Sequence, residues 1–159
     1  MAWAQIVVQW LHVLGGIFWF GSTLYALFIL APAMMSLPPQ TSAAAFRATA
    51  KRTAVTLETA GGITILFGIL RGTILGPVRS FEFLLGTPYG ITWGIALVLG
   101  LGILGWSHFV SAPSTERLAA AMASGDTASE MRRGLPLIVI ELAGFFGIFT
   151  CMILMRFGL

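Results

Sequence analysis

The chain alternates between long apolar stretches and short polar connections. The four apolar stretches cover residues 4–31, 53–75, 89–112 and 135–157. A helix rises ~1.5 Å per residue, so each stretch is long enough to cross the ~30 Å hydrocarbon core of a bilayer. Proline and glycine gather in the connections and mark the helix ends. The pattern predicts an all-α integral membrane protein, a bundle of four transmembrane helices in one domain, residues 1–159.

Composition supports this fold class and narrows the partners. Hydrophobic residues make up 57% of the 159 positions and charged residues only 9%, whereas a soluble domain carries roughly 25% charged residues. No basic stretch is interleaved with aromatic residues, so we expect no nucleic-acid partner. The single cysteine, Cys151, excludes an intrachain disulfide. The lipid bilayer is therefore the first partner that the sequence predicts.

Basic residues indicate the orientation. Six of the nine lysines and arginines lie on the first and third connections: Arg47, Lys51, Arg52, Arg117, Arg132 and Arg133. Cytoplasmic connections carry such an excess, so both termini are predicted to lie outside the cytoplasm, with the protein in the cell (inner) membrane. The alanine-rich segments 41–52 and 114–123 favour helix, and we expect them to extend the second and third helices beyond the bilayer.

A short repeated motif indicates an internal repeat. The segments KRTAVTLETAGG and RRGLPLIVIELAGF each place a basic pair before Glu-x-Ala-Gly, with Glu58 and Glu141 as the acidic residues. This motif predicts two related helical hairpins, arranged as parallel repeats about an axis along the membrane normal.

The first apolar stretch carries a polar face. Residues at spacings of three and four share one side of a helix, and here they are Gln5, Gln9, His12, Gly16, Trp19 and Thr23. Lipid disfavours polar groups, so this face is predicted to look inward. His12 is then either a ligand to a metal or cofactor, or a packing histidine bonded to a carbonyl or to Gln9.

Counting residues from the middle of each span places the other polar side chains at two levels. An outer level holds His12 together with Arg71, Cys151, Met152 and Met155. An inner level holds Glu58, His108 and Glu141, and it is a proton-sharing cluster, a metal site, or three separate groups near the headgroups. The two histidines are expected ~20 Å apart in depth, too far to ligate one iron. The sulfur side chains are soft ligands or apolar filler.

Several of these residues resemble a known superfamily. The first helix, with Trp10-Leu11-His12, Trp19-Phe20-Gly21, Tyr25 and Pro32, is similar to that of HemJ-type protoporphyrinogen oxidases and CopD-like copper-resistance proteins. The third helix, with Trp93 followed by His108, also resembles the HemJ type. The resemblance implies that His12 ligates a b-type haem. Leu97 occupies the position where a lysine of the HemJ site is expected, so the resemblance does not extend to the oxidase activity.

Three functions follow as hypotheses. The first is a redox membrane protein that binds haem b and belongs to the haem-dependent oxidoreductases. His12 would be the axial ligand, and Gln9 or a backbone carbonyl would accept a hydrogen bond from its second ring nitrogen. Trp19 would line the site, Met152 or Met155 would supply a sixth ligand, and Arg71 would meet a propionate.

The second hypothesis is copper handling. His12 with Cys151, Met152 and Met155 would suit Cu(I), and the inner level of His108, Glu58 and Glu141 would form a second metal station or a proton relay. The third is a non-catalytic accessory subunit of a larger membrane complex, with a redox partner or a second copy as neighbour.

Overall fold

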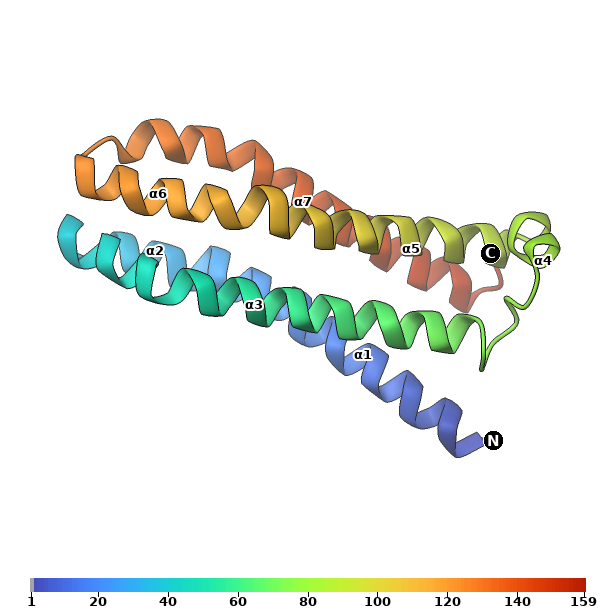
Figure 1. Cartoon of the computed structure of the whole chain (residues 1–159). Helices are drawn as coiled ribbons and strands as arrows, with labels where there is room; N and C mark the ends of the chain where they lie inside the picture. Colours follow the sequence, from blue (N-terminus) through green and yellow to red (C-terminus); the bar gives the residue numbers. More distant parts are fainter. Residues whose placement is uncertain (1) are drawn as a thin grey trace.

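The computed structural model of the protein describes residues 2–159, and nearly all of them are helical (Figure 1). No strand occurs within this range. Two of the segments, residues 26–30 and 107–111, are single π-helical turns. In chain order the elements are α1 (Ala2–Tyr25), η1 (Ala26–Leu30), α2 (Ala31–Met35), α3 (Pro39–Gly72), α4 (Phe81–Gly86), α5 (Pro88–Trp106), η2 (Ser107–Ser111), α6 (Ala112–Ser124) and α7 (Thr127–Arg156).

Consecutive elements join into four long rods. The turn η1 connects α1 to α2 and η2 connects α5 to α6 without a break, so the rods are Trp3–Met35, Pro39–Gly72, Pro88–Ser124 and Thr127–Arg156. All four are long and apolar enough to cross a membrane, which confirms the prediction of four long apolar helices. At ~1.5 Å per residue each rod is ~45–55 Å long, well beyond the ~30 Å of a hydrocarbon core.

The rods run side by side in an elongated bundle (Figure 1). The N-terminus, α4 and the C-terminus share one end, here called the terminal end, while the connections at 36–38 and 125–126 form the loop end. Helix α1 packs on α3, α5 packs on α7, and α3 joins the two pairs through α5 and α6. Toward the terminal end α1 diverges from the other rods, and this divergence makes room for the site described below.

Two buried clusters hold the bundle. The first lies at mid-length and contains Trp19, Ala60, Ile103 and Phe145, with the rings of Trp19 and Phe145 edge to face at 5.0 Å between centroids. The second lies near the loop end and contains Ala43, Phe46, Ala119 and Met122. The loop-end extension therefore has a core of its own.

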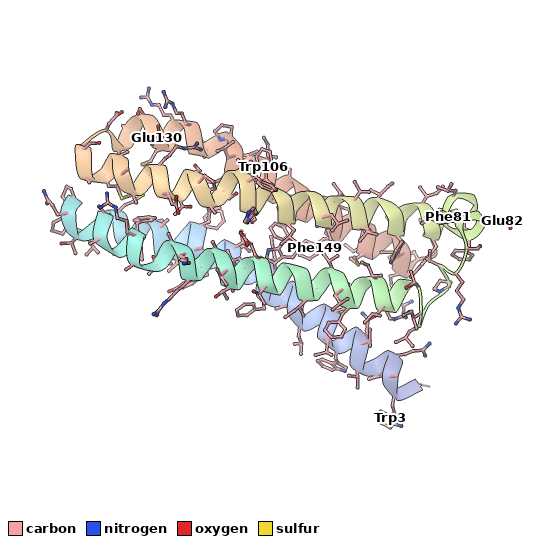
Figure 2. The ribbon with its side chains drawn as sticks, in the orientation of Figure 1. Trp3, Phe81, Glu82, Trp106, Glu130 and Phe149 are labelled. Atoms are coloured by element: carbon pink, nitrogen blue, oxygen red, sulfur yellow. The ribbon has the colours of Figure 1, made fainter. Side chains whose placement is uncertain are left out.

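The outside of the bundle is apolar. Large hydrophobic side chains are exposed along every rod. Figure 2 shows Trp3 and Phe81 at the terminal end, where they are 80% and 82% exposed. An apolar surface of this extent is typical of contact with lipid or with another apolar surface.

The helices are longer than the apolar pattern predicted. Helix α3 begins at Pro39 and α7 at Thr127, whereas the apolar stretches begin at 53 and 135. The alanine-rich segment ahead of residue 53 is helical as expected, because alanine favours helix and Ala43 is buried in the loop-end cluster. Helix α7 also continues through Pro136. The connection at 76–88 contains a short helix, α4, whose first turn is capped by the Ser80 hydroxyl accepting from the Phe83 N–H at 3.1 Å.

The two π turns share a local cause. The N–H of Ala31 donates to the Ala26 carbonyl, and the N–H of Ala112 donates to the Ser107 carbonyl, each five residues back. A proline follows both alanines in the sequence. Proline lacks an N–H, and its ring crowds the carbonyl one turn earlier, so a widened turn relieves the crowding inside a continuous rod.

The contact of α1 with α3 generates a stability prediction. A Cβ at Gly61 would lie 2.8 Å from the Trp19 ring, whereas a Cβ at Gly62 would meet nothing within 4 Å. We expect Gly61→Ala to lower the free energy of unfolding by about 1–3 kcal/mol, because the buried indole cannot move away without strain. Thermal unfolding in detergent measures the effect, with Gly62→Ala as the matched control. Equal midpoints for the two variants would contradict the packing described.

Candidate functional site

A cavity of about 430 Å³ lies between the four rods near the terminal end. This volume is within the ~300–1,000 Å³ common for small-molecule sites. Every rod contributes to its wall: Gln9, His12 and Trp19 from α1; Thr64, Ile65, Gly68, Ile69, Arg71 and Gly72 from α3; Tyr89, Trp93, Ala96, Leu97 and Gly100 from α5; and Ile148, Met152, Met155 and Arg156 from α7.

Two glycines of α3 let aromatic rings lie close to its backbone. A Cβ at Gly68 would lie 2.9 Å from His12 Cε1, and a Cβ at Gly72 would overlap the Trp93 indole. Any larger residue at these positions would push the two rings away from α3 and into the cavity. The glycines therefore position His12 and Trp93 as well as making space.

One nitrogen of the His12 ring is held by the backbone. Nδ1 lies 2.8 Å from the Thr64 carbonyl oxygen. A carbonyl only accepts, so Nδ1 carries the proton and donates. The other nitrogen, Nε2, then keeps its lone pair, and no hydrogen bond to it occurs among residues 2–159. Because His12 lines the cavity, the ring offers a coordinating nitrogen at the cavity wall, with its tautomer set by the opposite side.

The polar face of α1 looks inward only in part, because Trp19 and Thr23 are buried whereas Gln5 and Gln9 are exposed. Gln5 Nε2 donates to the Leu75 carbonyl at 2.9 Å, and Arg71 Nε donates to Gln9 Oε1 at 3.1 Å. Gln9 therefore bonds to Arg71, and the carbonyl of Thr64 bonds to His12. The alternative of a carbonyl acceptor for His12 is the one observed.

Trp19 lines the cavity and belongs to the central core. Its side chain is 3% exposed, and its Nε1 has no hydrogen-bond partner in the described part of the chain. A buried indole N–H usually has an acceptor. Trp106 Nε1, which lies outside the cavity wall, is unpaired in the same way, so this feature alone does not mark a ligand site.

Four of the five residues assigned to the outer level line this one cavity. His12, Arg71, Met152 and Met155 do so, whereas Cys151 is buried in the helix packing and is not part of the wall. Sequence reasoning did not assign Tyr89 and Arg156 to the site. The available signal for Arg156 was its position directly after Met155 on the last helix.

The inner-level residues all bond at η2. His108 Nδ1 lies 3.0 Å from Glu58 Oε1 of α3. From α7, Glu141 Oε1 accepts from the Ser107 hydroxyl at 3.0 Å, and Oε2 accepts from the Ser111 hydroxyl at 2.7 Å. Glu141 is buried, whereas the side chains of Glu58 and His108 are 28% and 60% exposed.

These contacts divide the inner level into two parts. The carboxylates of Glu58 and Glu141 bond to different side chains of η2, and no hydrogen bond joins them in residues 2–159. Within the same range no three His, Cys, Asp or Glu side chains are grouped so that they could hold a metal ion. The inner level therefore consists of a His108–Glu58 pair and, beside it, the Glu141 carboxylate, which accepts hydrogen bonds from two serine hydroxyls.

The two histidines lie at different levels, as predicted from the sequence. The His12 ring lies against Gly68 of α3, whereas His108 bonds to Glu58 of the same helix. Gly68 and Glu58 are ten residues apart, or ~15 Å along the helix axis. The α1 rod crosses α3 obliquely (Figure 1).

Comparison of the chain with protein-family models, with curated proteins and with solved structures finds no match. Function is therefore inferred from the geometry of the cavity and of the contacts at η2.

The two bonds to Glu141 generate a prediction. Glu141→Leu would leave the hydroxyls of Ser107 and Ser111 without their acceptor, whereas Glu141→Gln keeps one acceptor oxygen and adds a donor. We expect the leucine variant to lose about 1–3 kcal/mol in free energy of unfolding and the glutamine variant clearly less. Unfolding in detergent measures both, and Glu58→Leu, at a more exposed position, serves as control. A leucine variant as stable as the glutamine variant would overturn the role given to these bonds.

Proposed function

We propose that the protein is a b-type haem-binding redox protein of the cell (inner) membrane, with His12 as axial ligand. The observation that carries the proposal is the His12 ring, whose Nδ1 donates to the Thr64 carbonyl while Nε2 keeps a lone pair at the cavity wall. Metal-binding histidines are usually held in this way, because a bond to the second nitrogen fixes the tautomer and the ring orientation. When bound, haem supplies a one-electron iron couple.

The cavity has features that suit a flat macrocycle. Gly68 and Gly72 let the His12 and Trp93 rings lie close to α3, and Trp93 and Tyr89 supply aromatic surface from α5. Met152 and Met155 bring thioethers from α7 to the same cavity, and His/Met ligation is common for haem in electron-transfer proteins. In the proposed assignment α1 provides the fixed ligand and α7 provides the second.

The resemblance to HemJ-type proteins supports the same assignment. Trp93, which carries the third-helix resemblance, and Leu97, at the position of the expected lysine, both line the cavity that His12 lines. With an apolar leucine there, the wall lacks the amine of the HemJ site. We therefore propose haem-linked electron transfer and do not extend the proposal to porphyrinogen oxidation.

The same proposal includes a membrane orientation. The six basic residues of the first and third connections lie toward the loop end, while the terminal end has only Arg71, Arg79 and Arg156. This asymmetry supports a cytoplasmic loop end and extracytoplasmic termini.

The proposed parallel repeat gains support from two features. In each hairpin the first rod has a π turn followed by Ala-Pro. In each hairpin, too, the glycine of Glu-x-Ala-Gly faces a large side chain of the first rod: Gly61 faces Trp19 and Gly144 faces Ile103. Polar chemistry breaks the symmetry, because η1 is ALFIL and η2 is SHFVS, so both glutamates bond at η2.

Copper handling is the second candidate, and one observation favours it. His12, Met152 and Met155 line a single cavity, and imidazole with thioethers suits Cu(I). In this form of the hypothesis Cys151 is not a ligand, because it lies outside the cavity wall.

Replacement of His12 tests the proposal. We expect His12→Ala to abolish the Soret band of detergent-purified protein, because the imidazole that lines the cavity is lost and His108 is not part of its wall. Membrane insertion should persist, since alanine is well accepted in a membrane helix. His108→Ala is the matched control and should keep the band, because its ring bonds to Glu58 at another level.

The remaining outcomes separate the candidates. If metal analysis finds stoichiometric copper in wild-type protein that has no Soret band, and His12→Ala loses this copper, copper handling would replace haem binding as the proposed function. Wild-type protein with neither haem nor copper, after growth with both available, would refute both and favour an accessory subunit in which His12 is a packing residue.

Orientation has its own test. Because the basic residues favour a cytoplasmic loop end, a reporter that is active only outside the cytoplasm should work when fused after Leu159. It should fail when inserted at the 125–126 connection of a chain that still inserts. The reverse pair of results would refute the proposed orientation.

A further inference from the structure

We infer that the cavity selects a flat ligand with two carboxylates at one edge, and that Arg71 and Arg156 bind those carboxylates at the terminal end. This inference rests on the proposed function, since it adds a class of tetrapyrrole to the haem assignment. It goes further in assigning a recognition role to Arg156 and an orientation to the ligand.

The cavity wall carries two positively charged side chains. Arg71 of α3 and Arg156 of α7 both line the cavity, and among residues 2–159 no aspartate or glutamate does. Neither arginine forms a salt bridge in the described part of the chain. Arg71 is partly buried and Arg156 is exposed, and both lie in the last turns of their helices at the terminal end. A dianionic ligand would neutralise them.

The guanidinium group of Arg71 is oriented by a hydrogen bond to α1. Its Nε already donates to Gln9 Oε1, which fixes the plane of the guanidinium group. The two terminal nitrogens bond to nothing else in residues 2–159, and a guanidinium edge of this kind pairs with a carboxylate in a bidentate manner. Gln9 is thus a positioning residue for Arg71.

The two ends of the cavity wall differ in polarity along the bundle axis. Arg71 lies three residues beyond Gly68, which contacts the His12 ring, so it is ~4.5 Å nearer the terminal end. Arg156 is the last residue of α7. The opposite part of the wall is apolar and includes Trp19, Ile65 and Gly100. A ligand with its acid edge toward the terminal end and its apolar edge toward Trp19 matches both parts.

This pattern separates ligand classes. A copper ion would gain nothing from two arginines, and a neutral quinone would leave both charges unpaired. A tetrapyrrole with two adjacent acid side chains has one anionic edge and one apolar edge, which is what this wall complements.

The test uses metal-free protoporphyrin IX, a dicarboxylic acid, and its dimethyl ester. Each is titrated into purified protein in neutral detergent, and binding is followed by quenching of tryptophan fluorescence. We expect the diacid to bind at least ~10-fold more tightly than the diester. Arg71→Gln and Arg156→Gln should each weaken diacid binding ~10-fold and leave diester binding unchanged, because each removes one charge-assisted pair.

Arg79→Gln is the matched control, because it removes a charge at the same end from a residue that does not line the cavity, and diacid binding should persist. Diester binding also reports that each variant is folded. Should a glutamine variant fail to fold, the lysine variant at that position keeps the charge but loses the bidentate edge, and it should weaken diacid binding more than diester binding.

Equal affinity for diacid and diester, or a diacid affinity that neither arginine variant lowers, would overturn the inference. These results are distinct from failure of the haem assignment. If wild-type protein shows no Soret band yet discriminates the diacid through both arginines, the inference stands and iron ligation by His12 falls. If haem binds through His12 but both porphyrins bind equally, only the inference falls.

Discussion

The seam between α1 and α3 depends on small residues that let side chains of one helix rest on the backbone of the other. Gly15 faces Thr64, Gly61 faces Trp19, and Gly68 faces His12. In an apolar surrounding there is little hydrophobic drive to join two helices, so close packing and interhelical hydrogen bonds must hold them. The seam places the His12 ring within reach of the Thr64 carbonyl and puts Trp19 in the core. It ends before the terminal end, where α1 diverges and the cavity opens.

The π turn η2 organises the other half of the bundle. A residue and its fourth successor lie near one face of a helix, and in η2 these are Ser107 and Ser111, both of which donate to Glu141 of α7. His108, between them, turns to α3 and meets Glu58. One widened turn therefore ties α5 and α6 to both neighbouring rods through polar contacts, while the equivalent turn η1 is wholly apolar. The two hairpins share a backbone feature and differ in chemistry.

The sequence predicted the four helices and the inward position of Trp19 and Thr23 on α1, because both depend on periodic patterns of apolar and polar residues. It also placed His12, Arg71, Met152 and Met155 at one level, and all four line the cavity. The assignments that failed depend on three-dimensional details that spacing does not encode. Gln9 bonds to Arg71, and Cys151 is buried in the packing outside the cavity wall. The start of α7 at Thr127 was not predicted, whereas the extension of α3 ahead of residue 53 was predicted from its alanine content. The π turns had a sequence signal, the repeated Ala-Pro, which is readable only once the rods are known to be continuous.

The acceptor for His12 is a main-chain oxygen, and this affects how the site responds to mutation. Any residue at position 64 retains a carbonyl, so side-chain substitution there does not delete the bond that sets the tautomer. The position through which this ring can be disturbed is Gly68, where an added methyl group would displace the imidazole. The orientation of the His12 ring therefore depends on the backbone of α3 rather than on a polar side chain. Sensitivity to substitution should appear at a residue with no functional group of its own.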